Sequence, residues 1–381
     1  MLPHSHEPHP GAEPHSVITA EVITDLPAFH QLAEEWDCLL LDSRSSTPFL
    51  TFAWLSAWTH HHLGEGALHV IVVRERGCLI GLAPMMRAYR GLTLGERLEF
   101  LGTGTAGSDY LDLILRRGFE ADALSAIAGT IHALQLPLFC DHLPPDANAV
   151  ALQIALAELG WTSLESTPDV CPYVDLSAGT WDAFLQTLGA AHRANIRRRL
   201  RALQRDFDMS FEPVTTDAER RRALARLARW NRARWRDDGG TTAFPNRTSM
   251  AFHDDATRQA AEDGWLRLYT VTLNGRVEAV MYGFVIGKTF YFYQHGFNPD
   301  YSRYSLGLVL MALTIRSAIE DGLREFDMLY GHEAYKTLWA RHDRALMRLE
   351  LFPPRIGGTL LRRQAETRRM LRSIVGHLGL R

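Results

Sequence analysis

The sequence predicts a mixed α/β fold built as two similar lobes, each a mixed, mostly antiparallel sheet flanked by helices. Three observations lead to this prediction. The chain of 381 residues exceeds the usual size of one domain. Strand patterns and helix patterns alternate along it, and a similar order of elements occurs in both halves. With 46% hydrophobic and 22% charged residues, the composition is that of an ordinary globular protein.

The second half carries the clearest local pattern, a three-stranded antiparallel meander followed by a helix. Asn274 and Gly275 are the strongest signal, because this pair forms the two-residue turn of a hairpin. Ser305 can cap a helix whose apolar residues recur at helical spacing, and Gly322 would end that helix. A short helix is expected over 335–339. The predicted strands are 265–273, 276–286, 289–295, 325–329 and 344–352.

The first half shows the same order of elements more faintly. The predicted helices are 26–41, 49–62, 121–134 and 147–159, and the predicted strands are 68–73, 79–86, 98–101, 110–115 and 136–141. The two lobes are expected to join near 173–179. The chain therefore divides into a tail at 1–16, a first lobe at 17–175, a second lobe at 176–353 and a basic amphipathic helix at 354–381.

Composition argues against several classes of function. The net charge of −3 does not suit a protein that coats nucleic acid or an anionic membrane. No apolar stretch is long enough to span a bilayer, and the tail at 1–16 lacks the apolar segment of a signal peptide, so a cytoplasmic location is expected. The four cysteines form no CxxC pair and are expected to be buried, reduced thiols; no metal site is predicted. The helix at 354–381 is expected to pack on a lobe or a partner, with a membrane surface as the alternative.

A set of short motifs occurs in a fixed order through both halves of the chain. They are PF at 48–49 with Trp54 and Trp58, FL at 184–185, HRANIRR at 192–198, YQHGFNPDY at 293–301, SLG at 305–307, FD at 326–327, Gly331, and YK at 335–336 with Trp339. Together these motifs resemble the GNAT-like acetyltransferase domain of the CelD-like group of cellulose biosynthesis. That group is similar to the Fem-type aminoacyltransferases of peptidoglycan synthesis. The resemblance covers most of residues 45–345.

The resemblance implies two GNAT-like lobes and transfer of an acyl group from a thioester, usually acetyl-CoA, to an amine or occasionally a hydroxyl group. It also implies a role in exopolysaccharide or envelope metabolism. The leading hypothesis is an enzyme, a GNAT-like N-acyltransferase that moves an acetyl or other acyl group from acyl-CoA to an amine of a small or sugar-linked acceptor. Two alternatives stay open: a Fem-like transferase that uses aminoacyl-tRNA, and a non-catalytic scaffold in polysaccharide biosynthesis.

The donor is expected where the loop after the third meander strand enters the next helix. Free amide groups and the helix dipole at that point suit a phosphate, and the predicted binding residues are Arg303, Ser305, Leu306 and Gly307. The plainer interpretation is that Ser305 only caps the helix and Gly307 only allows close packing. The GNAT phosphate loop usually has glycine where this chain has Leu306 and Leu308. Because of this departure, aminoacyl-tRNA stays an alternative donor.

Four residues are predicted to act on the reacting groups. Tyr335 stands where GNAT enzymes often place the tyrosine that protonates the leaving thiolate, and Glu333 could take the amine proton. Lys336 could bind an anionic group or stabilise the oxyanion, and His295, at the end of a strand, could serve as a base. The alternatives are Tyr335 in the core, Lys336 on the surface and His295 in a structural role.

Substrate contacts are predicted in both halves. Arginines recur every four residues over 193–205 and therefore share one helical face, on which Arg193, Asn195 and Arg197 are the chosen contacts. A solvated face is the default interpretation, with an anionic substrate or RNA as alternatives. In the first half, Trp54, Asp109 and Tyr110 are expected to line a cleft toward the second lobe, although aromatic residues at helical spacing usually belong to a core.

Overall fold

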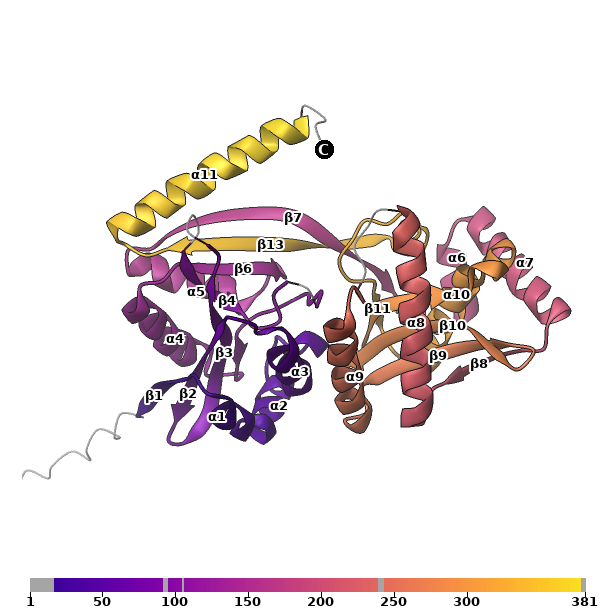
Figure 1. The fold of residues 1–381 in the computed structure, drawn as a ribbon, viewed down its shortest axis with the longest axis horizontal. Coiled ribbons are helices and arrows are strands. Elements are labelled where there is room, and N and C mark those ends of the chain that lie inside the picture. Colours follow the sequence, from indigo (N-terminus) through magenta and orange to yellow (C-terminus); the bar gives the residue numbers. More distant parts are fainter. Residues whose placement is uncertain (1–16, 92–94, 105, 239–242, 378–381) are drawn as a thin grey trace, which may run out of the picture.

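The structure is a computed structural model that describes residues 17–91, 95–104, 106–238 and 243–377. Within these residues, thirteen strands form one continuous sheet, mostly antiparallel, with helices packed against it (Figure 1). The predicted fold class is confirmed, with the difference that the sheets expected in two lobes are joined into one. The predicted tail at 1–16 lies outside the described residues.

Most strands agree with the predicted ones to within three residues. They are β1 (Ile18–Ile23), β2 (Ala67–Glu75), β3 (Cys78–Tyr89), β4 (Glu96–Phe100), β5 (Ile114–Leu115), β6 (Leu138–Leu143), β7 (Thr162–Asp175), β8 (Met209–Pro213), β9 (Leu266–Leu273), β10 (Arg276–Ile286), β11 (Thr289–Phe297), β12 (Glu325–Asp327) and β13 (His342–Phe352). No range was predicted for β1, β7 or β8. The strand predicted over 110–115 is wrong over its first four residues, since Tyr110 has a left-handed backbone with φ of +57°, which interrupts an extended run.

The helices follow the predicted order. They are α1 (Leu26–Gln31), α2 (Ala33–Leu41), α3 (Phe52–His62), α4 (Glu120–Leu134), α5 (Asn148–Glu158), α6 (Trp181–Thr187), α7 (Ala190–Asp206), α8 (Asp217–Asp238), α9 (Arg247–Glu262), α10 (Leu306–Glu320) and α11 (Ile356–His377), with 3-10 turns η1 (Pro48–Leu50), η2 (Pro299–Tyr304) and η3 (Lys336–Leu338). Among the described helices, none combines the length and the apolar character needed to cross a membrane.

Two long strands join the halves of the molecule. The sheet order is β1-β2-β3-β4-β6-β13-β7-β12-β11-β10-β9-β8, so β13, from the end of the chain, pairs with β6 of the first half. In exchange β7, from the end of the first half, pairs with β12 of the second half. β7 and β13 run side by side along the first half and reach the edge of the second (Figure 1). Each half therefore completes its sheet with a strand from the other part of the sequence.

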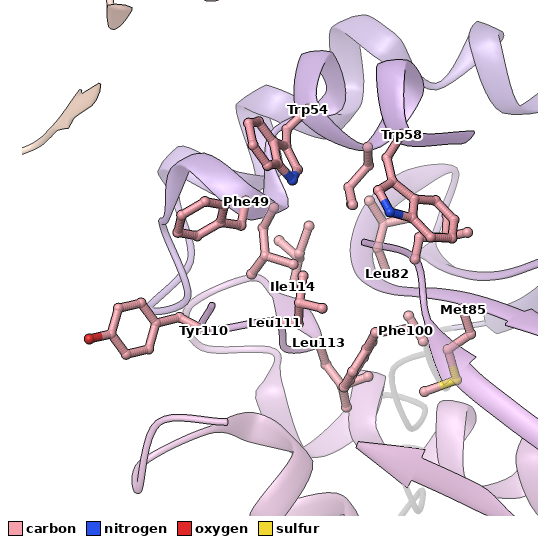
Figure 2. Close-up of a cluster of buried hydrophobic side chains, with 14 of the residues drawn as sticks. Phe49, Trp54, Trp58, Leu82, Met85, Phe100, Tyr110, Leu111, Leu113 and Ile114 are labelled. Carbon is pink, nitrogen blue, oxygen red and sulfur yellow. The ribbon is translucent and has the colours of Figure 1, made fainter. Parts of the chain in front are cut away.

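Two hydrophobic cores lie in the molecule. The larger core fills the first half and continues under α8 and α9, and Figure 2 shows part of it, with Trp54 and Trp58 reaching in from α3. Tyr110 lies at the edge of this part, with its hydroxyl group directed away from the other side chains (Figure 2). The smaller core lies between the second half of the sheet and helices α6, α7 and α10. Alternate residues of β11 enter different cores: Tyr291 enters the larger, and Phe290 and Phe292 the smaller.

The two halves also meet through an aromatic interface between α3 and α9. Trp54 of α3 packs against Phe252 of α9, with ring centroids 4.8 Å apart, and against Tyr293 of β11, at 5.5 Å. His253 of α9 is fully buried in the same interface, and neither of its ring nitrogens has a hydrogen-bond partner among the described residues. Burial of this kind penalises the charged imidazolium, so the pKa of His253 falls to about 3.

The buried histidine predicts an acid-sensitive interface. Its folded-state pKa lies below the unfolded value near 6.5, so the unfolded chain binds more protons and stability is lost as pH falls below about 6.5. Between pH 7 and pH 5 we expect a loss of about 2 kcal/mol from this residue. Urea unfolding at both pH values measures the loss, which should shrink in His253→Phe. The matched variant at exposed His60, His60→Gln, should keep the wild-type difference.

All four cysteines are free, but the prediction that all are buried is wrong for two of them. Cys140 and Cys171 are buried, whereas Cys38 and Cys78 are exposed. Cys38 lies on the solvent side of α2, whose buried residues are Trp36, Leu39 and Leu40, and Cys78 begins β3 directly after a turn. Apolar neighbours in the sequence therefore did not indicate whether a cysteine is buried, because the side chains of adjacent helical residues point in different directions.

Candidate active site

The second half of the sheet opens between two neighbouring strands. β11 and β12 are parallel and pair over three positions only, the last of them Tyr291 with Asp327. Beyond that pair β11 continues to Phe297, while the chain after β12 leaves the sheet as a loop. Within the opening, β11 carries a bulge at Tyr293, since its pairing with β10 passes from Phe292 directly to Gln294. A β-bulge changes the direction in which the side chains of a strand point, and bulges are common next to active sites. We therefore take this opening as the first candidate for the position of the active site.

One side of the opening is formed by the start of α10. Gly307 lies in its first turn, where an added Cβ would stand 2.8 Å from the ring of Phe297 and 3.7 Å from Nε2 of His295. The amide groups of Leu306 and Gly307 have no acceptor among the described residues, as is usual for a first helical turn. The side chain of Leu306 is fully buried, so only its backbone can serve a ligand.

Ser305 precedes α10 as predicted, but its side chain makes no capping hydrogen bond. Its backbone is left-handed, with φ of +54°, whereas a capping residue normally has an extended backbone that directs its oxygen to the first-turn amides. The prediction of a side-chain cap is therefore wrong. The first-turn amides stay available as a result, and they are the groups that bind anions at helix starts.

Two predicted catalytic residues meet at this corner. The rings of His295 and Tyr335 lie 5.4 Å apart, and Phe292 packs beside both, at 5.4 Å from His295 and 6.5 Å from Tyr335. We name the group of Phe292, His295, Phe297, Gly307 and Tyr335 the donor corner. It lies on the α10 side of the sheet.

Arg303 stands next to the donor corner on η2. Its guanidinium lies 4.9 Å from the ring of Tyr304, and its backbone carbonyl accepts a hydrogen bond from Arg199 of α7. Neither arginine forms an ion pair with an acidic residue among the described residues. Two cations therefore flank the start of α10, and neither is in direct ion-pair contact with a carboxylate of the described residues, although the charge of Arg303 acts on Asp206.

Lys336 is buried, with 3% of its surface exposed, and holds the loop after β12 closed. Its Nζ donates to the carbonyl oxygens of Leu329, at 3.2 Å, and Tyr330, at 2.6 Å, and lies 3.0 Å from a carboxylate oxygen of Glu333. The surface interpretation of Lys336 is wrong. An ammonium group has three N–H donors, and these three oxygen atoms provide one acceptor for each of them. Glu333 balances its charge, so both predicted residues contact each other in the structure.

A buried polar network connects this loop with the first half of the chain. Asp327 is fully buried and accepts hydrogen bonds from the hydroxyl group of Tyr110, at 2.8 Å, from Arg344, at 2.6 Å, and from the amide of Leu329, at 2.8 Å. Burial raises the pKa of Asp327 to about 6, against the lowering effect of Arg344. Tyr110 thereby ties the first half to the end of β12.

Asp109 makes a second connection from the same segment. One of its carboxylate oxygens accepts the amide hydrogen of Tyr330, at 2.9 Å, and the other lies 3.0 Å from Nδ1 of His142. The rings of His142 and Tyr330 are stacked, with centroids 5.1 Å apart. Asp109 was predicted, but His142 was not. It lies within β6, one residue beyond the predicted strand 136–141, and no sequence signal distinguishes it from the other histidines.

Backbone strain concentrates at the same place. Seven non-glycine residues have positive φ among the described residues; Arg76 and Asn274 lie in hairpin turns, and Gln135 ends a helix. Ser305 begins α10. The other three are Tyr110, His142 and Leu329, and all three surround Asp109 and Asp327. Such strain persists where the surroundings enforce it, and it clusters at functional sites.

The other predicted substrate residues do not join this cluster. Trp54 is 2% exposed, and its indole N–H donates to Ser108, so it belongs to the interface between the halves. Arg193 donates to the backbone carbonyls of Leu185 and Leu188 at the end of α6. Asn195 accepts from Arg198, and Arg197 lies 3.9 Å from Asp182 on the surface. No cluster of His, Cys, Asp and Glu suited to a metal ion is found in the part of the chain that the structure describes.

Two cavities help to place the site. One of about 270 Å³ borders the network and is lined by Tyr110, Tyr291, Glu325 and Arg344 among others. Another of about 680 Å³ lies between β8, β9 and the end of α10 and includes none of the predicted site residues. We therefore place the candidate site by the converging polar groups and the strand opening rather than by cavity size.

Comparison with known proteins gives a match to one family model. Residues 190–337 match the model of the Acetyltransferase (GNAT) domain family, a range that includes the donor corner, the loop held by Lys336 and α7. No curated protein matches the chain.

Several solved structures share the fold across almost the whole chain. The structure of FemX has a TM-score of 0.61 at 12% identity and covers 87% of this chain and 96% of its own. The C-terminal domain of a putative lysylphosphatidylglycerol synthetase from Agrobacterium fabrum has a TM-score of 0.55 at 12% identity, covering 89% and 96%. L-PGS from Bacillus licheniformis has a TM-score of 0.52 at 13% identity, covering 88% and 95%. Residues 190–337 are therefore similar to the GNAT acetyltransferase domain family, and the chain shares its overall fold with FemX and the two synthetase structures.

Proposed function

We propose that the protein is an acyltransferase that moves an acyl group from acyl-CoA to an amine of a small or sugar-linked acceptor. The observation that carries the proposal is the donor corner, where β11 and β12 part beside a helix start with free amides. The motif resemblance to the CelD-like group supports an acceptor in exopolysaccharide or envelope metabolism.

The donor corner and its surroundings offer groups for both the pyrophosphate end and the thioester end of acyl-CoA. The first-turn amides of α10, with Arg303 and Arg199 beside them, would bind the pyrophosphate. The pantetheine arm would then follow the opening between β11 and the loop held by Lys336, which places the thioester near the bulge at Tyr293. Backbone groups that the bulge removes from the ladder of hydrogen bonds are suited to polarise the thioester carbonyl.

Transfer requires one bond to form and one to break. The amine nitrogen, after losing a proton, attacks the thioester carbon, the new C–N bond forms, and the C–S bond breaks with release of the CoA thiolate. Tyr335 lies at the donor corner and would give its hydroxyl proton to this thiolate, recovering it later from water. His295, in ring contact with Tyr335, would orient that hydroxyl group. Lys336 would act by holding the loop that carries Tyr335.

A single-atom change at the start of α10 tests the donor position. Gly307→Ala places a Cβ against the ring of Phe297 and narrows the corner, so the Kd for acetyl-CoA should rise at least about tenfold. Isothermal titration calorimetry with acetyl-CoA measures this change. Gly129→Ala is the matched control, because Gly129 lies in α4 with open space around its missing Cβ. It should leave the Kd unchanged.

A second candidate is a transferase that uses aminoacyl-tRNA. It is favoured by α7, whose exposed Arg197, Arg198 and Arg201 lie on the helix that packs against η2 and the start of α10. Failure of the folded wild-type chain to bind acetyl-CoA would overturn the first candidate. Binding of tRNA that weakens steeply with salt would then establish the second, since phosphate contacts release counterions.

A further inference from the structure

We propose that His142 is the general base for the acceptor amine, with Asp109 as its positioning residue. The inference rests on the proposed acyl transfer and adds a role for two residues from the first half of the chain. It also assigns the acceptor side of the site to the contact between the halves, opposite the donor corner.

The geometry is that of an oriented imidazole. Nδ1 of His142 lies 3.0 Å from the carboxylate of Asp109, which is itself 4% exposed. Its Nε2 has no partner among the described residues, and 25% of the side chain is exposed. The carboxylate of Asp109 favours the tautomer with its proton on Nδ1. The lone pair then lies on Nε2, which points away from Asp109. Stacking on Tyr330 holds the plane of the ring.

The ring lies beside the loop that leaves β12 at the opening of the sheet, through its contact with Tyr330. Tyr330 follows the last paired residue of β12, Asp327, by three positions, and Asp109 binds its amide directly. Leu329 and Tyr110, the neighbours of this contact, pack in the larger core, whereas Phe292 and Tyr335 of the donor corner pack at the smaller one. A donor and a base that approach from opposite sides of the sheet would meet at the thioester carbon.

The charges around His142 favour its role. Burial lowers the pKa of His142, but the hydrogen bond to Asp109 and the charges of Asp109, Asp141 and Asp169 outweigh burial, so the net shift is upward. Asp141 is paired with Arg348, and Asp169 also faces Tyr330. A raised pKa makes the imidazole a stronger base toward an ammonium group, and carboxylates nearby attract that cation.

The proton path balances as follows. Nε2 of His142 first takes one proton from the acceptor ammonium ion and passes it to water, which frees the nitrogen lone pair for attack. It then takes the second proton as the C–N bond forms. The imidazolium that results is stabilised by the carboxylate of Asp109 and later releases the proton to water. Tyr335, on the other side of the sheet, supplies the proton for the thiolate.

Nuclear magnetic resonance of the full chain labelled with ¹⁵N-histidine tests the arrangement without any substrate. The ring signal absent from His142→Gln identifies His142. In the wild-type chain we expect the neutral ring to carry its proton on Nδ1, with a pKa above 6.5. In Asp109→Asn the amide group would donate to Nδ1, so the proton should move to Nε2 and the pKa should fall. A wild-type ring protonated on Nε2 would overturn the proposal, whether or not Asp109→Asn folds.

Release of CoA from acetyl-CoA, with ethanolamine or water as the acceptor, tests the chemical role between pH 6 and 9. His142→Gln should slow release by about 10²–10⁴-fold and remove the ionisation of His142 from the pH profile. Its calorimetric Kd for acetyl-CoA should stay within about twofold of wild type. His60→Gln, in an exposed part of α3, should leave both quantities unchanged. Equal rates and equal pH profiles in wild type and His142→Gln would overturn the proposal, whereas a missing Kd in wild type would overturn the donor assignment alone.

Discussion

Lys336→Met should abolish measurable acyl transfer and lower the free energy of unfolding by about 2–4 kcal/mol. The Met side chain has a similar length but no donors, so the carbonyl groups of Leu329 and Tyr330 and the carboxylate of Glu333 lose their cation. Without it the loop between β12 and β13 loses its closed form and releases Tyr335 from the donor corner. Urea unfolding and CoA release measure the two effects.

The chain has two lysines, which provides a matched control. Lys288 lies exposed in the turn between β10 and β11, so Lys288→Met should change neither stability nor transfer. The combination of lost stability and lost transfer in Lys336→Met would support its role in holding the loop. Lost transfer at wild-type stability would contradict that role and would show that the ammonium group acts on the substrate.

Trp54→Ala should destabilise the chain by about 3–5 kcal/mol, as expected for a buried tryptophan. The indole packs on Phe252 of α9 and on Phe284 and Tyr293 of the second half, and its N–H bonds Ser108. Its removal leaves a cavity between the halves and frees the segment that carries Asp109. Urea unfolding gives the free energy, and amide hydrogen exchange should show faster exchange in both α3 and α9.

Trp54→Phe separates packing from substrate binding. It keeps most of the ring contacts and loses one hydrogen bond, so we expect a smaller destabilisation of about 1–2 kcal/mol. If Trp54 contacted the acceptor, Trp54→Phe would raise the KM for the acceptor at nearly unchanged stability. The structure leads us to expect an unchanged KM, because the side chain is enclosed by the two halves.

Elements with strong local signals were predicted well from the sequence. Asn274 and Gly275 have φ of +50° and +76° and form the expected turn, with Leu273 paired to Arg276. The helix after the meander begins at Leu306 and ends before Gly322, whose φ of +70° suits a glycine. Turn chemistry and helical spacing act over a few residues, so these features need no tertiary information.

Parts of the candidate site were predicted from motif order alone. His295, Gly307 and Tyr335 meet at the donor corner, and Lys336 and Glu333 contact each other in the adjacent loop. Their catalytic roles are the proposal made above. The roles of Arg193, Asn195 and Arg197 in substrate binding stay predictions, since their contacts in the structure are local to α6 and α7.

The sequence by itself determined the positions of most strands and of the helices with clear patterns, the hairpin turn and the motif set of the second half, because these depend on neighbours within about ten positions. Only the tertiary structure decided that β7 and β13 exchange between the halves and that Asp109 meets His142 and Tyr330. Those contacts join residues far apart in the chain, and their free energy comes from burial and hydrogen bonds that exist only once the strands have paired. The same pairing holds Tyr110, His142 and Leu329 in left-handed backbone conformations that these residues do not prefer locally. For this reason no local sequence pattern predicted these conformations.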